Sequence, residues 1–294
     1  MSLAWKDIEQ AYRCKPGRPT FRRPQSRTPI RERKARSDSA VSCNARCMRR
    51  LVVLGASGGR PTAGQACSGF LLDWNGMRIL LDLGYGTLPQ LLQHVSDGGV
   101  DAVVVTHEHP DHCVDLHALF RVRHYSYPDG PRIPLYSPPG VLERLTGLEP
   151  DVDLSSVFDH HPLPGEYNLG AMRLMASSLP HFVPNVGVRL DGDGGVVAYA
   201  TDTGPHDTLA DLGRHADVYV LDATDRPGET ERSERNLLTA AEAGMWAQRS
   251  GARRLLLTHL WPGTDPASSA ERARQAFTGP VEVATQGLVV ELDD

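Results

Sequence analysis

Four side chains of metal-binding types lie within six residues, directly after an apolar run. Residues 106–112 read Thr-His-Glu-His-Pro-Asp-His, which places these side chains at His107, His109, Asp111 and His112. Imidazole nitrogens and carboxylate oxygens suit Zn, Mn or Fe(II). The alternative is a solvated polar loop, but such a loop does not require three histidines and an aspartate immediately after Val103-Val104-Val105. The run therefore predicts a metal site at the end of a buried strand.

Three more candidate ligands follow other apolar runs. They are His181 after residues 172–179, Asp202 after residues 196–200, and His259 after residues 255–257. Each is a weak signal alone, because a single polar residue often ends a strand. Together they predict ligands gathered at one rim of the sheets, where a site is expected.

The elements that must position these residues are short strands alternating with helices. Apolar runs predict strands at 51–54, 68–73, 78–82, 102–105, 133–136, 171–177, 186–190, 196–200, 217–221, 254–258, 281–283 and 288–292. Helical spacing predicts helices at 87–95, 115–124, 141–145, 237–250 and 267–277. Hairpin turns at Asn75-Gly76 and at residues 191–195 indicate an α+β fold of two β-sheets with helices packed outside. No linker interrupts residues 48–294, which are predicted to form one domain with two similar halves.

This combination of motifs resembles the metallo-β-lactamase superfamily over about residues 48–294. The resemblance implies a four-layer αββα sandwich with two divalent metal ions, expected to be zinc, with manganese or iron as alternatives. It assigns the first metal to His107, His109 and His181. It assigns the second metal to Asp111, His112 and His259, and it makes Asp202 the carboxylate that bridges the two metals.

Five further segments are similar to the tRNase Z-like branch, and within it to short bacterial phosphodiesterases that open 3′,5′-cyclic nucleotides. They are residues 66–72 (Ala-Cys-Ser-Gly-Phe-Leu-Leu), 80–84 (Leu-Leu-Asp-Leu-Gly), 180–189 (Pro-His-x2-Pro-x2-Gly-x-Arg), 199–204 (Tyr-Ala-Thr-Asp-Thr-Gly) and 255–262 (Leu-Leu-Leu-Thr-His-Leu-Trp-Pro).

The chain departs from the pattern of this branch in three places. Leu237 stands where the branch usually carries a histidine that is expected to bind or protonate the phosphate. Asp222 stands where a glutamate is frequent. Residues 151–170 are too short and too acidic to form the flexible arm with which tRNase Z enzymes hold tRNA.

Three side chains have expected roles beyond metal binding. Asp111 is expected to orient the nucleophile as well as bind metal. His206, four residues after Asp202, is either the acid that protonates the departing oxygen or the first residue of a helix. Ser57, in the glycine-rich turn 55–59, either donates to a phosphate oxygen or makes the turn. Asp111 and His206 are thus the predicted catalytic residues.

Charge is distributed unevenly along the chain. Residues 11–50 hold 13 Lys or Arg and two acids, whereas from residue 51 onward 32 acids outnumber 17 basic residues. The acidic body is expected to repel a phosphate backbone, so any nucleic acid is expected to bind through the basic tail. That tail, residues 1–47, is predicted to be a disordered extension or an unused upstream segment before a start at Met48, with an RNA-binding arm or a transit segment as alternatives.

The cysteine content and the absence of long apolar runs indicate where in the cell the protein is expected. Five cysteines form an odd, sparse set, which argues against a disulfide framework and for a reducing cytoplasm. Cys43 and Cys47 are more simply unpaired thiols than a metal pair, because no second pair follows nearby. The N-terminus lacks the apolar core of a signal peptide, and no apolar run approaches the ~18 residues of a membrane helix.

The expected function is a dinuclear-metal hydrolase that cleaves a small phosphodiester, such as a 3′,5′-cyclic nucleotide, by metal-bound hydroxide. Three alternatives stay open. A metallo-hydrolase of lactones, thioesters or β-lactams is favoured by Leu237, and a tRNA 3′-processing endonuclease by the basic tail. A metal-binding partner or sensor module without activity is disfavoured by the complete ligand set. Relatives in this branch are often dimers, so the resemblance also implies a homodimer.

Overall fold

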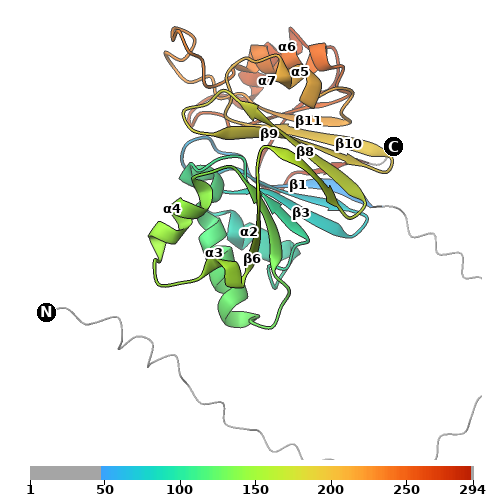
Figure 1. Ribbon diagram of the computed structural model, residues 1–294. Helices are drawn as coiled ribbons and strands as arrows, with labels where there is room; N and C mark the ends of the chain where they lie inside the picture. The colour runs from blue at the N-terminus through green and yellow to red at the C-terminus, as the bar shows by residue number, and fades with distance from the viewer. Residues whose placement is uncertain (1–47, 293–294) are drawn as a thin grey trace, which may run out of the picture. The chain divides into compact units, whose positions relative to one another are not determined.

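Two mixed β-sheets lie face to face in the middle of the molecule (Figure 1). The structure is a computed structural model that describes residues 48–292. The predictions made for the basic tail, for Cys43 and for Cys47 therefore lie outside the described residues, and the domain boundary at residue 47 stays a prediction.

Each sheet has seven strands within the described residues. The first sheet has the order β14 (Val289–Glu291), β1 (Arg49–Gly55), β2 (Gly69–Trp74), β3 (Met77–Leu83), β4 (Ala102–Val104), β5 (Ile133–Ser137) and β6 (Phe158–Pro162). The second has the order β13 (Val281–Val283), β12 (Leu255–Thr258), β11 (Val218–Asp222), β10 (Gly195–Ala200), β9 (Asn185–Gly192), β8 (Met172–Leu179) and β7 (Gly165–Leu169).

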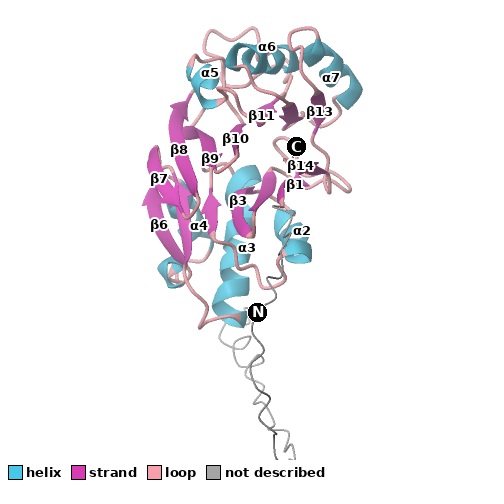
Figure 2. Ribbon diagram, turned by 90° about the vertical axis from the view of Figure 1, so that its right-hand side faces the viewer, coloured by secondary structure: helices cyan, strands magenta, loops and turns pink. Residues whose placement is uncertain are grey.

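Helices cover the outer face of both sheets (Figure 2). The first sheet packs against α2 (Thr87–His94), α3 (Pro110–Ser126) and α4 (Val141–Leu148), and the second against α5 (Thr208–Leu212), α6 (Ala240–Ser250) and α7 (Pro266–Arg274). The predicted four-layer αββα sandwich is confirmed. Among the described residues, no helix is long and apolar enough to cross a membrane.

The central strands are apolar throughout because both faces of each sheet are buried. In β1, Leu51 and Val53 face the core between the sheets, whereas Val52 and Leu54 face the helices. In β11, Val220 faces the core between the sheets and Tyr219 the helices. Side chains of a strand alternate between its faces, so an unbroken apolar run supplies two cores at once.

The predicted hairpin turns are present. β2 and β3 are joined by Asn75 and Gly76, whose φ angles of 54° and 90° are positive. A tight two-residue turn of this kind requires positive φ, which Asn and Gly adopt most readily. The loop 191–195 likewise joins β9 to β10.

Two helices begin three or more residues away from their predicted starts. α3 begins at Pro110 rather than Asp115, because proline is well accommodated in the first turn, where its missing N–H costs nothing. α6 begins at Ala240 rather than Leu237. Thr239 and Glu242 cap its N-terminus reciprocally, each side chain accepting the other residue's backbone N–H.

The sequence missed β6 and β7, and it anticipated α5 only as the helix start left open at His206. β6 reads Phe-Asp-His-His-Pro and forms one edge of the first sheet, while β7 forms an edge of the second. Edge strands are partly exposed and need no continuous apolar run, so the apolar pattern is weak there. Residues 151–170, for which no tRNA-binding arm was expected, hold a 3₁₀ turn (Leu154–Ser156) and these two strands.

The strand order places the carboxyl ends of the parallel strands along one edge of each sheet. β3 to β6 run parallel in the first sheet, and β10 to β13 run parallel in the second. The carboxyl ends of parallel strands lie at the same edge of a sheet, where ligand sites of such sheets form. β4 ends shortly before His107, β10 before Asp202 and β12 before His259.

Candidate metal centre

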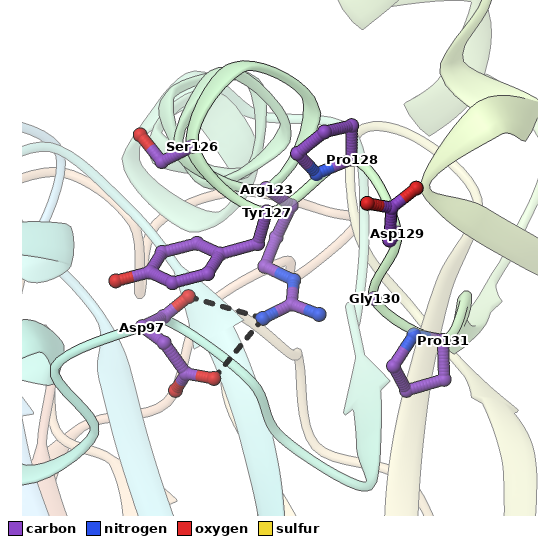
Figure 3. Close-up of a pocket in the computed structure, with 8 residues that line it drawn as sticks. All are labelled: Asp97, Arg123, Ser126, Tyr127, Pro128, Asp129, Gly130 and Pro131. Atoms are coloured by element: carbon purple, nitrogen blue, oxygen red, sulfur yellow. Dashed lines mark hydrogen bonds and ion pairs between the residues drawn. The ribbon is translucent and has the colours of Figure 1, made fainter. Parts of the chain in front are cut away.

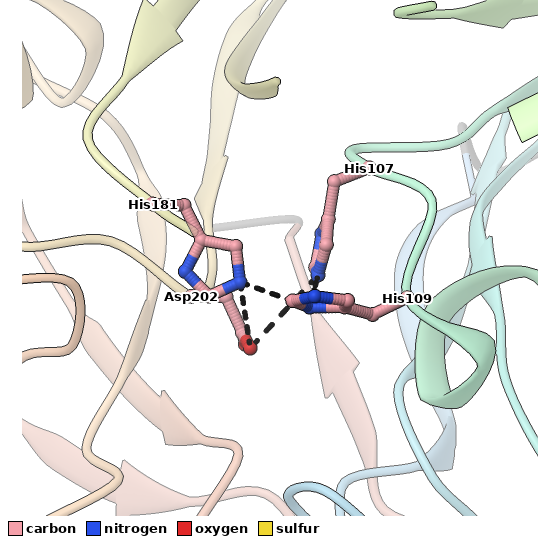
Figure 4. Close-up of side chains that lie close together, drawn as sticks. All are labelled: His107, His109, His181 and Asp202. Carbon is pink, nitrogen blue, oxygen red and sulfur yellow. Dashed lines mark hydrogen bonds and ion pairs between the residues drawn. The ribbon is translucent and has the colours of Figure 1, made fainter. Parts of the chain in front are cut away.

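The first group of predicted ligands comprises His107, His109, His181 and Asp202 (Figure 4). One ligand atom of each residue lies within 4.8 Å of those of the others. His109 Nδ1 lies 3.0 Å from both His107 Nε2 and His181 Nε2. Asp202 Oδ2 lies 4.0 Å from His107 Nε2 and 3.7 Å from His181 Nε2. Three imidazoles and one carboxylate oxygen thus converge on one point.

The second group comprises Asp111, His112, Asp202 and His259. Asp202 Oδ1 lies 3.3 Å from His112 Nε2 and 3.1 Å from His259 Nε2. Asp111 Oδ2 lies 3.6 Å and 3.2 Å from the same two nitrogens. Asp202 therefore faces the first group with one oxygen and the second with the other, which is the placement that a bridging carboxylate needs.

The histidine run is positioned by the junction of β4 with α3. His107 follows the end of β4, and His109 is the N-cap residue of α3. Asp111 and His112 lie in the first turn of that helix. Because an extended segment is followed by a helical turn, His107 and His109 contribute to the first group whereas Asp111 and His112 contribute to the second.

Backbone strain marks the same region. Asp82, Asp202 and His259 have φ angles of 55°, 55° and 56°, in the left-handed region that non-glycine residues rarely adopt. Such conformations cluster at functional sites, because the surrounding contacts must hold them. For Asp202, Asn185 Nδ2 donates to the Asp202 carbonyl at 2.8 Å and to the Thr201 carbonyl at 3.2 Å.

The glycine-rich turn after β1 approaches the second group closely. The Gly59 N–H donates to Asp111 Oδ2 at 2.9 Å. A Cβ at Gly58 would lie 2.6 Å from the His259 carbonyl oxygen, so a larger residue would displace one of the two. The Ser57 hydroxyl donates to the Arg60 carbonyl at 2.8 Å, which is the turn-forming one of its two predicted roles.

Asp82 is the anchor of the histidines on the first sheet, and the sequence did not single it out as a site residue. This fully buried carboxylate accepts from His112 Nδ1 at 2.8 Å and from the Tyr199 hydroxyl at 2.7 Å. It also accepts from the backbone N–H and the hydroxyl of Thr106, and that hydroxyl lies 3.0 Å from His107 Nδ1. Such outer hydrogen bonds set the ring orientation and the tautomer of a ligand histidine.

A matching arrangement serves the second sheet. Asp222 lies 3.2 Å from the Thr224 hydroxyl, which lies 3.1 Å from His259 Nδ1. His181 Nδ1 lies 3.1 Å from the Asn236 carbonyl oxygen, to which it can only donate. These contacts leave the Nε2 lone pairs of His181 and His259 directed at the two groups. Asp222, noted in the sequence as a shorter acid than usual, thus has a positioning place in the structure.

The pKa shifts favour deprotonated ligands in the first group. Burial lowers the pKa of His107 well below its usual value and that of His181 to about 4. Burial alone would raise the pKa of Asp202, but His259 and His112 outweigh it and hold that pKa at about 2. At pH 7 these residues therefore present two neutral imidazoles and a carboxylate, the forms in which they bind metal.

In the second group, the surrounding carboxylates favour a positive charge on His112. Burial lowers the pKa of His112, but the carboxylates of Asp202, Asp82 and Asp111 outweigh it and raise that pKa well above its usual value. His112 Nε2 and Asp202 Oδ1 are both buried without a hydrogen-bond partner. A cation between these two atoms would satisfy both.

The donor set fits divalent metals. A tetrahedral ion with ligands at about 2.0–2.2 Å holds its ligand atoms roughly 3.3–3.6 Å apart. The separations given above, 3.0–4.0 Å, bracket that value, and all ligand atoms of a group lie within 4.8 Å of one another. The chemistry of the donors, imidazole nitrogen and carboxylate oxygen, suits Zn, Mn or Fe(II). The structure thus brings all seven predicted ligands together in an arrangement that can hold two ions.

The other predicted catalytic residue, His206, lies outside both groups. It is exposed beside the start of α5, where its Nδ1 accepts from the Thr208 N–H at 3.3 Å. This is the helix-start place that the sequence left open for it. Its role as a proton donor stays a prediction.

A hollow of about 360 Å³ at the C-terminal end of α3 is unrelated to these groups (Figure 3). Its main cation, Arg123, donates to the carbonyl and the carboxylate of Asp97, both at 3.2 Å, and stacks over Tyr127. The hollow contains none of the seven predicted ligands, and its arginine is already paired. We therefore place the candidate site at the metal centre.

Comparison with known proteins places the chain in a family. Residues 77–260, more than half of the chain, match the model of the beta-lactamase superfamily domain, so the protein belongs to the β-lactamase superfamily. Membership and the two His/Asp groups make it a hydrolase of the metallo-β-lactamase type.

Individual relatives agree with this assignment. An uncharacterized protein of Mycobacterium leprae is 35% identical over 260 residues, which are 83% of this chain and 88% of the relative. Ribonuclease Z of Kineococcus radiotolerans is 31% identical over 287 residues, 79% of this chain and 90% of that enzyme. The crystal structure of the metallo-beta-lactamase fold protein YhfI from Bacillus subtilis matches with a TM-score of 0.74 at 25% identity, covering 83% of this chain and 99% of YhfI. The predicted resemblance to the superfamily and to its ribonuclease Z relatives is confirmed.

The two groups predict a metal content of about two divalent ions per chain, since seven side chains offer two sets of donors that share Asp202. Elemental analysis of the full chain, purified after growth with zinc, measures this ratio. Removal of the metal by a chelator should also lower the midpoint of thermal unfolding, because an ion that binds only the folded state stabilises it. A chain that retains no metal under replete conditions would contradict the assignment of the ligands.

Proposed function

We propose that the protein is a dinuclear-metal phosphodiesterase that hydrolyses small phosphodiesters, with 3′,5′-cyclic nucleotides as the best candidates. The observation that carries the proposal is the position of Asp202 between the two groups of donors. Two divalent ions held by these groups would supply positive charge that polarises the phosphate and acidifies water. Support also comes from the relatives named ribonuclease Z, since ribonucleases act on phosphodiester bonds.

The residues of the chain supply orientation. Asp202 contacts one group with each carboxylate oxygen, and Asp82 and Asn236 fix the rings of His112 and His181. The Gly59 N–H donates to Asp111 Oδ2 and so helps to fix the carboxylate that is expected to orient the attacking water. Preorganised groups of this kind need no rearrangement when charge develops on the phosphate.

The alternatives make separate predictions about substrates. A lactone, thioester or β-lactam hydrolase would act on neutral acyl bonds, and a tRNA 3′-processing enzyme would act on precursor tRNA. Residues 151–170 form edge strands rather than an extended arm, which disfavours the tRNA substrate.

The test of the proposal is a substrate panel on the metal-replete full chain. The panel contains bis-p-nitrophenyl phosphate, cyclic AMP, precursor tRNA and a set of lactones, with chelator-treated protein as the control. We expect turnover of the first two. Hydrolysis of lactones without hydrolysis of either diester would overturn the proposal in favour of acyl chemistry, and turnover of precursor tRNA alone would favour the nuclease.

Leu237→His is expected to raise phosphodiesterase activity. Leu237 is buried and directly follows Asn236, whose carbonyl oxygen lies against His181 Nδ1. A histidine there would add a proton donor beside the site, and a positioned donor contributes about 10²–10⁴-fold in favourable cases. Since the donor must be protonated, the gain should be present below the pKa of the new histidine and be lost as pH rises through it.

The control for this prediction is Leu237→Asn, which introduces a polar side chain that cannot act as an acid near neutral pH. Rates on bis-p-nitrophenyl phosphate across pH 5–9 compare the three proteins. An unchanged kcat in the histidine variant, at full metal content, would show that this position has no such role here.

The homodimer and the cytoplasmic location expected from the sequence stay predictions.

A further inference from the structure

Two exposed aromatic side chains flank the metal centre. Phe182 follows the ligand His181, and their ring centroids lie 5.1 Å apart. Trp261 lies two residues after the ligand His259 and packs over Gly59, the residue whose N–H donates to Asp111. Phe182 is 44% exposed and Trp261 is 36% exposed, although large apolar side chains are usually buried. One ring thus borders each group of donors.

An arginine side chain lies over each of the two rings, and both arginines belong to one segment of the chain. The Arg226 guanidinium carbon lies 5.4 Å from the centroid of Trp261, and that of Arg232 lies 5.2 Å from the centroid of Phe182. Both arginines belong to residues 225–236, the loop between β11 and α6, which we call the arginine loop (Figure 1). The loop therefore reaches from the side of the second group to the side of the first.

Specific contacts hold the arginine loop in place. At its start Asp225 pairs with Arg272 on α7 at 2.6 Å. In its middle the buried carboxylate of Glu229 accepts from the Asn236 N–H at 2.8 Å and lies 3.8 Å from Arg232 Nε. Because the Asn236 carbonyl oxygen lies against His181, the loop is tied directly to a predicted ligand.

Arg226 and Arg232 differ in whether a carboxylate lies beside their positive charge. Among the described residues no carboxylate pairs with Arg226, which contacts the Trp261 ring. The side chain of Arg232 faces Glu229 but is still 47% exposed. A guanidinium that lies over a ring can keep N–H donors free, and in Arg232, whose Nε donates to the Glu234 carbonyl at 3.4 Å, these belong to the two terminal nitrogens. Two such donors beside the metal centre contrast with a body in which acids outnumber basic residues from residue 51 onward.

We propose that Arg226 and Arg232 bind the phosphate oxygens of a nucleotide at the metal centre, while the exposed surfaces of Phe182 and Trp261 contact its base. This proposal rests on the proposed function and names its substrate class. Guanidinium groups bind phosphate through paired hydrogen bonds, and aromatic side chains stack on any base. The arginines are binding residues that act beside the donor groups and take no part in holding metal.

The test measures the binding of 5′-AMP and of inorganic phosphate to the metal-replete full chain by calorimetry, which needs no turnover. Arg226→Ala and Arg232→Ala should each weaken the binding of 5′-AMP about tenfold, the effect of losing roughly 1.4 kcal/mol. Arg226→Lys should weaken it less, since it keeps the charge but loses the planar fork. Metal content should be unchanged in all variants.

The matched control is Arg249→Ala. Arg249 lies on α6, over the ring of Trp246 at 4.9 Å, and pairs with Asp207 at 2.7 Å, so its loss removes the same cation–π contact and one ion pair from another surface. We expect this variant to bind 5′-AMP like the wild type. Equal weakening by this control would assign the effect to general loss of charge and would overturn the proposal.

The outcomes separate this inference from the proposed function. If the wild type hydrolyses phosphodiesters but Arg226→Ala and Arg232→Ala bind 5′-AMP normally, the role of the arginines is wrong and the function stands. If no phosphodiester is hydrolysed but the variants lose affinity for 5′-AMP, the function is wrong and the nucleotide site stands. A wild type that binds neither 5′-AMP nor phosphate overturns the site.

Discussion

Asp202→Ala is expected to lower turnover at least about a thousandfold, because the proposed charge stabilisation, worth several kcal/mol, would require both ions. Asp202 is the only described residue that belongs to both groups of donors. Its loss removes one ligand atom from each group at once and leaves His112 Nε2 and His259 Nε2 without their nearest carboxylate oxygen. Metal content should therefore fall together with activity.

Two comparisons make the result specific to the carboxylate. Alanine at a φ of 55° adds backbone strain of about 1–2 kcal/mol, whereas asparagine tolerates this conformation. Asp202→Asn thus separates the loss of charge from the loss of backbone fit, and it should be nearly as inactive as the alanine variant. Asp193→Ala, on the exposed loop between β9 and β10, should behave like the wild type.

Steady-state rates on bis-p-nitrophenyl phosphate and elemental analysis are the measurements. Near-normal turnover of Asp202→Ala with two ions bound would show that Asp202 does not bridge the metals. Low activity in Asp193→Ala as well would indicate general damage to the β9–β10 hairpin.

Asp82→Asn is expected to lower metal affinity or activity about 10–100-fold, the usual effect of changing an outer partner of a metal ligand. The buried carboxylate accepts hydrogen bonds from Thr106, His112 and Tyr199 at once. An amide of the same shape turns one acceptor oxygen into a donor, so at least one of these partners is left facing N–H. The His112 ring then loses the contact that directs its Nε2 towards the second group.

This substitution should also destabilise the fold. A buried donor without its acceptor costs about 1–3 kcal/mol, and the contact with Tyr199 joins the two sheets. Thermal unfolding of the metal-free protein isolates that effect from metal binding.

The control is Asp73→Asn, in the neighbouring strand β2. Asp73 is also buried but contacts Arg50 and the Gly76 N–H rather than a predicted ligand. It should lose some stability and keep its metal affinity. Unchanged metal affinity in Asp82→Asn would mean that the orientation of His112 does not depend on Asp82.

The sequence alone identified the predicted ligands because their signal is local. Four of the seven lie within residues 106–112, and the other three follow apolar strands. Apolar runs predicted the central strands well, since strands buried on both faces need such runs. Edge strands β6 and β7 were missed because half-exposed strands impose no such pattern.

Other features depend on contacts between residues far apart in the chain, which no local pattern encodes. Asp82 lies 24 to 117 positions from the partners of its hydrogen bonds, and the motif 80–84 that contains it gives no sign of these contacts in the sequence. The arginine loop is a polar segment without apolar periodicity, so the sequence pattern assigns it no role. Its place beside the site is apparent only in the structure, where Arg226 lies over Trp261 and Arg232 over Phe182. The sequence by itself determined the donor chemistry and the layered fold, because residue type and apolar periodicity act locally. Only the tertiary structure decided which carboxylates orient the ligands and which cations border the site, because those roles arise when distant segments pack together.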